Sequence, residues 1–295
     1  MGQGRIIGKP NTPTNDLASG IWSLGEQYAA KRSRSWPNVW NNASELVTAG
    51  YTTDGVYKIN LPTVGITNVY CLLDPKWDGG GWMLAMKAAN TGTTFSYSSS
   101  YWTTDNTLNS TSVNLSSGDA KYEVMNKFAA KDIMARWPDI STNGGSIANT
   151  GTWTWMENNF NNSTRQTLIS FFTTPSNRTS TSGGGGSGYF IRDAKTFNGW
   201  QSGVFSSQVD IRFYGFNYNG YNNATAFRVR WGFGWNENGE GLFPGSVVQY
   251  SGTNDVYGGI GLDSSGNSWS AGDRISCCAD TTGINRQARV EIFVR

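Results

Sequence analysis

VYCLLDPKWDGGGWML, residues 69–84, is the stretch of this 295-residue chain that decides the fold. Its first residues form an apolar run that predicts a buried strand and contains Cys71. Three glycines follow, Gly79 to Gly81, and they permit a tight bend because glycine has no Cβ and reaches positive φ freely. Trp82 opens a second apolar run. We therefore expect a strand, a tight bend and another strand, with Trp82 in the core.

Helical patterns in the rest of the chain are few. The apolar residues of 120–137 recur with a rough helical period before Pro138, and residues 163–172 predict a second helix. Together with many short strand-like runs, this pattern predicts an α+β fold with short strands, few helices and long loops. The other predicted strands are residues 55–59, 82–87, 209–216, 226–231 and 289–294, and the predicted polar loops are residues 90–118, 142–162 and 179–188.

The composition excludes several classes of function. The chain has no His, which removes Ser-His-Asp and Cys-His catalysis and His-ligated zinc. Its formal net charge of +2 argues against a broad nucleic-acid-binding surface. No apolar run approaches the ~20 residues that span a bilayer, so we expect no membrane insertion. Three cysteines cannot all pair within one chain, and we expect reduced or optional thiols at Cys71, Cys277 and Cys278.

Two regions carry a resemblance to a known family. The triple-glycine stretch, with the preceding run Gly55–Ile59, resembles the opening of a fibrinogen-like C-terminal domain. Three later runs resemble the ending of the intelectin-type branch of that family: Arg228–Trp231, Gly258–Gly261 and Arg289–Arg295. The resemblance implies a fibrinogen C-terminal-like head domain over residues 51–295.

Residues 1–50 differ from the head and are expected to form an attachment arm. Asn11-x-Pro13, the run Ala18–Tyr28 and Trp36-Pro37 are similar to N-terminal segments of tailed-phage virion proteins. The first ten residues lack the apolar run of a secretory signal, which predicts assembly in a host cytoplasm. The resemblance implies a virion location, contacts with other virion proteins through the arm, and a homo-oligomer, a trimer by analogy with such appendages.

The C-terminal part of the head is rich in oxygen ligands, which predicts a calcium site because Ca²⁺ takes six to eight oxygens from flexible loops. Intelectin-like lectins bind calcium in this region and hold a sugar's vicinal hydroxyls through it. The resemblance places Asn254 where that family has a His ligand and Asp273 where it has a structural-site Asp. The family's Glu falls near Ser265, so Asp263 is the nearest carboxylate. The same polar residues can also cap turns and solvate loops.

The predicted site residues form two overlapping groups. The expected metal ligands are Glu237, Asn254, Asp255, Asp263 and Asp273. The expected ligand-binding residues include aromatic side chains that can stack on sugar faces or pack in the core, and they are Trp235, Asn236, Asn254, Asp255, Tyr257 and Trp269.

These observations predict a non-enzymatic structural virion protein whose head binds a host-surface glycan in a calcium-dependent way. A free secreted-type lectin of the same class is one alternative. A polysaccharide hydrolase is another, because Glu237 and Asp255 supply the two carboxylates that glycoside hydrolysis needs. Such phage hydrolases are usually long and repetitive, and this chain has no internal repeat, so no catalytic residue is predicted.

Overall fold

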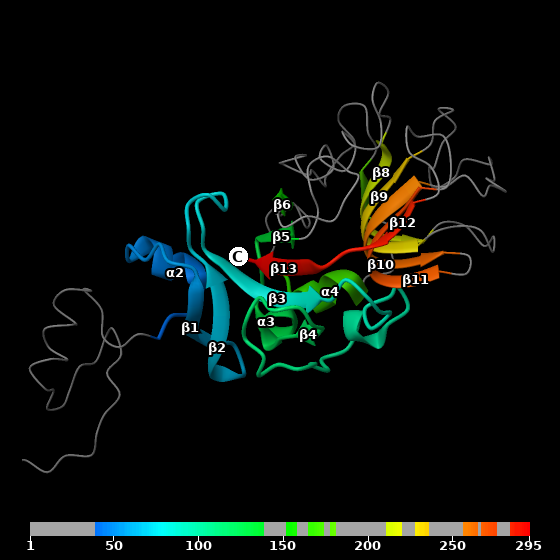
Figure 1. The fold of residues 1–295 in the computed structure, drawn as a ribbon. Helices are drawn as coiled ribbons and strands as arrows, with labels where there is room; N and C mark the ends of the chain where they lie inside the picture. Colours follow the sequence, from blue (N-terminus) through cyan, green and yellow to red (C-terminus); the bar gives the residue numbers. More distant parts are fainter. Residues whose placement is uncertain are drawn as a thin grey trace, which may run out of the picture. The chain divides into compact units, whose positions relative to one another are not determined.

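The computed structural model describes short antiparallel strands and a few short helices (Figure 1). This confirms the predicted α+β class. The chain divides into two compact units, Met1–Trp82 and Met83–Arg295. Most of the predicted arm lies outside the described residues, and its boundary after residue 50 stays a prediction. The described residues are 39–138, 152–157, 165–173, 178–180, 211–219, 228–235, 256–264, 267–275 and 284–295.

The first unit contains a short helix and a β-hairpin. Helix α2 (Ala43–Thr48) begins where the side chain of Asn42 accepts a hydrogen bond from the Glu45 amide, at 3.0 Å. Strands β1 (Gly55–Leu61) and β2 (Gly65–Leu72) pair in antiparallel register. Their buried side chains alternate with exposed ones, as expected for strands with one covered face.

The triple-glycine bend follows β2 and has the predicted conformation. Gly79, Gly80 and Gly81 all have positive φ, between 77° and 84°. A Cβ on Gly80 would lie 2.5 Å from the Leu73 carbonyl oxygen, so the backbone approaches too closely for any side chain. The Trp82 side chain after the bend is fully buried, as predicted, and its Nε1 donates to the Trp77 carbonyl at 2.6 Å.

One carboxylate holds the segment that leads into this bend. The Asp54 side chain accepts hydrogen bonds from the backbone amides of Leu73 and Asp74, at 2.7 and 2.9 Å. Its second oxygen accepts from Trp77 Nε1 at 3.1 Å. Asp54 therefore ties the start of β1 to the turn after β2.

The second unit contains a first antiparallel sheet in which β13 lies between β3 and β5 (Figure 1). β4 pairs with β3, and β6 pairs with β5. Nearly every side chain of the three central strands is buried, which places the core of the unit here. The strands are β3 (Trp82–Ala88), β4 (Ala120–Lys121), β5 (Asp132–Trp137), β6 (Thr152–Glu157) and β13 (Val290–Val294).

The same unit contains a second antiparallel sheet with the strand order β12-β11-β10-β9-β8-β7. Glycines occupy one row across four strands, because Gly215 pairs with Gly232, Gly232 with Gly259, and Gly259 with Gly272. The strands are β7 (Arg178–Ser180), β8 (Ile211–Asn219), β9 (Arg228–Trp235), β10 (Val256–Ser264), β11 (Asn267–Ile275) and β12 (Ile284–Gln287).

The helices of the second unit are short: η1 (Ser100–Trp102), α3 (Glu123–Lys127) and α4 (Leu168–Thr173). An aromatic cluster joins η1 to α4. The rings of Trp102 and Phe172 lie 4.8 Å apart in an edge-to-face arrangement, and the indole of Trp102 donates to the Ser96 carbonyl at 2.9 Å.

Several predicted elements are confirmed, and two are wrong. The predicted strands at 55–59, 82–87, 209–216, 226–231 and 289–294 correspond to β1, β3, β8, β9 and β13. The predicted helix over 120–137 is instead β4, α3 and β5, because residues 132–137 pair with β13 and β6 in the buried sheet. Residues 152–157, expected in a loop, form β6.

Three further expectations concern the core. Trp82 and Trp231 are buried, which confirms their assignment to it. Cys71 is a free buried thiol, and burial raises its pKa well above the ordinary value. Cys277 and Cys278 lie outside the described residues.

The glycine bend predicts a large difference between two neighbouring substitutions. Gly80→Ala combines a positive φ with a contact of 2.5 Å to the Leu73 carbonyl oxygen. We expect it to lower the free energy of unfolding by about 2–4 kcal/mol. Gly79→Ala has a similar φ but open space around the Cβ, so about 1 kcal/mol is expected. Chemical denaturation measures both, and equal losses would contradict the steric argument.

Candidate functional site

The segment with the most predicted ligands lies outside the described residues. Asn236, Glu237, Asn254 and Asp255 all belong to it, between the end of β9 and the start of β10. The two strand ends are themselves described. Trp235 pairs directly with Val256, so the segment leaves and rejoins the sheet at one point.

Two other predicted residues lie at the same end of the second sheet. Tyr257 is the second residue of β10 and pairs with Gly234 and Arg274. Asp273 in β11 pairs with Gly258. The register therefore brings Trp235, Tyr257 and Asp273 within three positions of one sheet end. This is the placement that a shared site would need, and their roles stay predictions.

Asp263 lies at the opposite end of β10. It comes six positions after Tyr257, a distance of about 20 Å along a strand. Its carboxylate pairs with Arg228 and accepts a hydrogen bond from the Ser268 hydroxyl at 2.8 Å. Trp269 is 8% exposed and packs in the core. The structure thus does not bring these two residues together with the predicted ligands at the other end.

A cluster that the sequence did not predict surrounds Asp263. The guanidinium carbons of Arg228 and Arg230 lie 5.2 and 4.3 Å from the centre of the Tyr97 ring, within the range of cation–π contacts. Arg228 faces Asp263 directly across β9 and β10. We call Tyr97, Arg228, Arg230 and Asp263 the arginine–tyrosine cluster.

Arg230 is the half-buried anchor of this cluster. Its Nε donates to the Tyr97 carbonyl at 2.8 Å, and its Nη1 donates to Asn217 Oδ1 at 3.1 Å and to the Phe172 carbonyl at 3.3 Å. Gly261 leaves room for it, because a Cβ there would lie 2.6 Å from Arg230 Cγ. Arg230 thereby fixes the ring of Tyr97 beside β9.

Arg228 is the part of the cluster that solvent reaches. Its side chain is 39% exposed, and that of Asp263 is 18% exposed. Burial raises the pKa of the Tyr97 hydroxyl, which therefore stays protonated at neutral pH. The cluster offers guanidinium donors, a carboxylate acceptor and an aromatic ring on one surface. These groups can bind a polyhydroxylated or anionic ligand.

The sequence indicates only part of the arginine–tyrosine cluster. The alternation Arg228-Val-Arg230 marks two side chains on one face of a strand. Nothing local connects them to Tyr97, which lies 133 residues from Arg230. The cluster is therefore created by tertiary structure.

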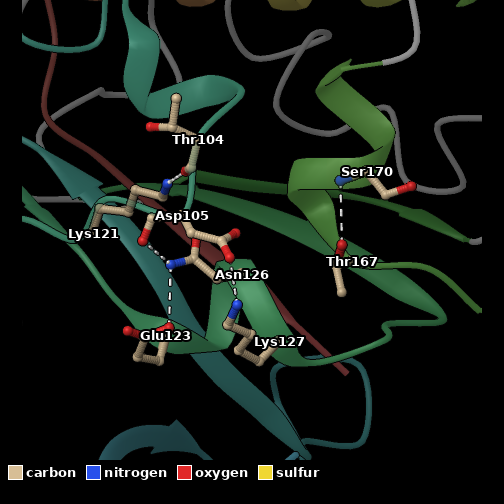
Figure 2. A network of polar contacts seen from close by, with 8 residues as sticks. All are labelled: Thr104, Asp105, Lys121, Glu123, Asn126, Lys127, Thr167 and Ser170. Atoms are coloured by element: carbon tan, nitrogen blue, oxygen red, sulfur yellow. Dashed lines mark hydrogen bonds and ion pairs between the residues drawn. The ribbon is translucent and has the colours of Figure 1, made fainter. Parts of the chain in front are cut away.

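A second polar network surrounds Lys121 (Figure 2). Lys121 is fully buried, and its ammonium donates to the Thr104 carbonyl. Asn126 donates to the Asp105 carbonyl at 2.8 Å and to a Glu123 carboxylate oxygen at 3.2 Å, and Lys127 pairs with Asp105. On the neighbouring helix α4, the Ser170 amide donates to the Thr167 hydroxyl at 3.2 Å.

These contacts make the Lys121 network a structural connection between α3 and the segment after η1. Burial lowers the pKa of Lys121 to about 8, and the carboxylates of Asp105 and Glu123 partly oppose that decrease. Among the described residues, no three Asp, Glu or Cys side chains are grouped as metal ligands would be. No helix in the described ranges is long and apolar enough to cross a bilayer.

Comparisons with known proteins add little. No family model and no curated protein matches the chain. Among solved structures, the chain is similar to the fibrinogen-like globe domain of human ANGPTL6, at 15% sequence identity. The match covers 40% of this chain and about half of the other, 48%, with a TM-score of 0.26. A similarity this low carries no argument about fold or function.

The buried Lys121 predicts a pH dependence of stability. Its pKa is about 8 in the folded protein and near 10.5 in the unfolded chain. Between these values the unfolded chain binds the additional proton, so the free energy of unfolding contributed by Lys121 rises with pH. The full change corresponds to about 3 kcal/mol.

Denaturation of the wild type and of Lys121→Met at pH 7 to 10.5 isolates this contribution, since other titrating groups are common to both proteins. The wild type should gain stability relative to the variant above about pH 8. A constant difference across this range would contradict the assignment.

Proposed function

We propose that this chain is a non-enzymatic virion protein of a tailed phage whose head binds a host-surface glycan. The observation that carries the recognition role is the arginine–tyrosine cluster. It combines an aromatic ring, a partly exposed guanidinium and a carboxylate, the groups that hold hydroxyls and anionic substituents in polar sites. The virion role is supported by the resemblance of residues 1–50 to virion segments.

Within this proposal, Arg228 is the direct contact to the ligand. Asp263 accepts from one nitrogen of Arg228, Nη2, and among the described residues no other acceptor takes a hydrogen bond from this guanidinium. Its remaining donors can then serve ligand oxygens. Asp263 and Ser268 orient the guanidinium. Arg230 is a positioning residue, because its contacts are to the protein itself.

The proposed calcium site belongs to the other end of the second sheet. Glu237, Asn254, Asp255 and Asp273 have the carboxylate and amide oxygens that Ca²⁺ prefers. The adjacent strand ends Trp235 and Val256 support their convergence, since the segment that carries three of them is anchored there. When bound, calcium supplies coordination for sugar hydroxyls. Asp263 is left out of this ligand set because Arg228 and Ser268 use its carboxylate.

The arm, residues 1–50, is proposed to attach the head to other virion proteins and to sister subunits in a homo-oligomer. A trimer agrees with the class of appendage that the sequence resembles. Attachment by the arm leaves the head to meet the host surface. The alternative of a free lectin uses the same head and differs only in the partner of the arm.

The recognition role predicts that Arg228→Ala weakens glycan binding. The probe is a panel of purified bacterial cell-wall and capsular polysaccharides, with binding measured by calorimetry on the full chain. For a polysaccharide that binds, we expect at least a tenfold loss, or about 1.4 kcal/mol. The matched control is Arg165→Ala, which removes another exposed arginine of the second unit.

Three results would change this proposal. Equal losses for Arg228→Ala and Arg165→Ala would remove the arginine–tyrosine cluster from the site. Binding that survives a calcium chelator would remove calcium from it. Breakdown of the polysaccharide during the measurement would replace the lectin with a hydrolase.

A further inference from the structure

Lys87 is the next-to-last residue of β3 and is 2% exposed. Its amine donates to the side-chain carbonyl of Asn114 and to the backbone carbonyl of Ser116, each at 3.0 Å. Asn114 belongs to the segment between η1 and β4, and its side chain is at the surface. A buried lysine amine thus meets a side-chain carboxamide that solvent can reach.

The carboxamide of Asn114 is polarised by further donors. Its Oδ1 accepts the Ser116 backbone amide at 3.0 Å and also the Ser116 hydroxyl. Lys87 is a third donor to this oxygen before it reacts. The two Ser116 donors remain when Lys87 attacks the carbonyl carbon, and they stabilise the negative charge that develops on the oxygen.

A buried carboxylate lies opposite Lys87 on the neighbouring strand. Glu291 in β13 is the direct register partner of Lys87 and is 1% exposed. Directly opposite side chains on neighbouring strands have Cβ atoms about 5 Å apart. Arg136 Nε forms an ion pair with Glu291 Oε2 at 2.6 Å. Among the described residues, no donor makes a hydrogen bond of ordinary geometry to either carboxylate oxygen.

Burial favours the neutral forms of both groups. It lowers the pKa of Lys87, although the charge of Glu291 opposes this change and that of Arg289 adds to it. It also raises the pKa of Glu291, against the opposing charges of Arg136, Arg289 and Lys87. A neutral amine is the nucleophilic form of lysine, so the environment brings Lys87 nearer to its reactive state.

We propose that Lys87 and Asn114 form an intramolecular isopeptide bond. Glu291 takes a proton from the Lys87 ammonium, and the amine Nζ attacks Cγ of Asn114. The oxygen Oδ1 carries the negative charge while Ser116 donates to it. The Cγ–Nδ2 bond then breaks, and the proton held by Glu291 passes to the leaving nitrogen. The attacking Nζ loses its second proton to the Glu291 carboxylate, which passes it on to the released ammonia. The products are a secondary amide and one ammonium ion, with no oxidant or reductant involved.

The surroundings hold the reacting groups together. The Arg289 guanidinium donates to the Leu115 carbonyl at 3.2 Å, and the Tyr122 hydroxyl donates to the Ser112 carbonyl at 2.6 Å. Both contacts fasten the segment that carries Asn114. By contrast, the buried Lys121 donates to a backbone carbonyl, which has no leaving group of this kind.

The bond would close a loop between positions 27 residues apart and tie β3 to the segment before β4. A covalent link of this kind restricts the unfolded chain, as a disulfide does, but reducing agents do not break it. It stabilises the second unit whether or not the head binds a glycan.

Peptide mapping by mass spectrometry tests this proposal on the full chain, purified and incubated at neutral pH. The expected result is a branched peptide that contains Lys87 and Asn114, lighter by one ammonia than the two linear peptides together. Asn114→Ala should abolish it. Glu291→Gln and Ser116→Ala should slow its formation at least tenfold. Asn106→Ala, which removes another exposed asparagine between η1 and β4, is the matched control and should retain it.

Near-ultraviolet circular dichroism confirms that each variant is folded. Two linear peptides from folded wild-type protein would overturn the proposal. A branched peptide from Asn114→Ala would overturn the choice of Asn114. An unchanged rate in Glu291→Gln would overturn the role of Glu291. None of these results depends on glycan binding, so the proposed function is tested separately.

Discussion

The close approach of the chain at Gly80 is the constraint on which the first unit depends. The backbone there passes so near the Leu73 carbonyl that only glycine fits, and the three positive φ angles turn the chain within three residues. The Asp54 carboxylate fixes the segment before the bend, and Trp82 fills the core directly after it. Sterics, one hydrogen-bonding group and one large side chain therefore act on the same short stretch.

Buried charge is the second organising feature. Only 15% of the residues are charged, yet Lys87, Glu291 and Arg136 occupy one row across three neighbouring strands of the first sheet. A charge removed from water is costly unless a partner compensates for it. The alternation of signs in this row provides that compensation. The row places a lysine and a carboxylate side by side in the core, where neutral forms are favoured.

The sequence predicted the local features well and the long-range ones poorly. The glycine bend and β13 follow from residue types and alternation, which are local signals. The predicted helix over 120–137 is wrong because its last residues form β5. This strand pairs with β13, more than 150 positions later in the chain. The resemblance groups Asp263 with Asp273, but the strand register places it at the other sheet end, beside Arg228. Register depends on partners that periodicity does not reveal.

Burial decides what each basic side chain of the second unit can do. Arg228 keeps 39% of its side chain in solvent, so its charge and spare donors can serve a ligand. Lys121 is fully buried, and among the described residues its ammonium donates to a backbone carbonyl alone, so it holds a segment in place. Lys87 has also lost solvent, but it meets a polarised carboxamide with a carboxylate beside it, and this adds chemical reactivity. Binding, support and reaction thus follow from the exposure of each cation and from the acceptors that it faces.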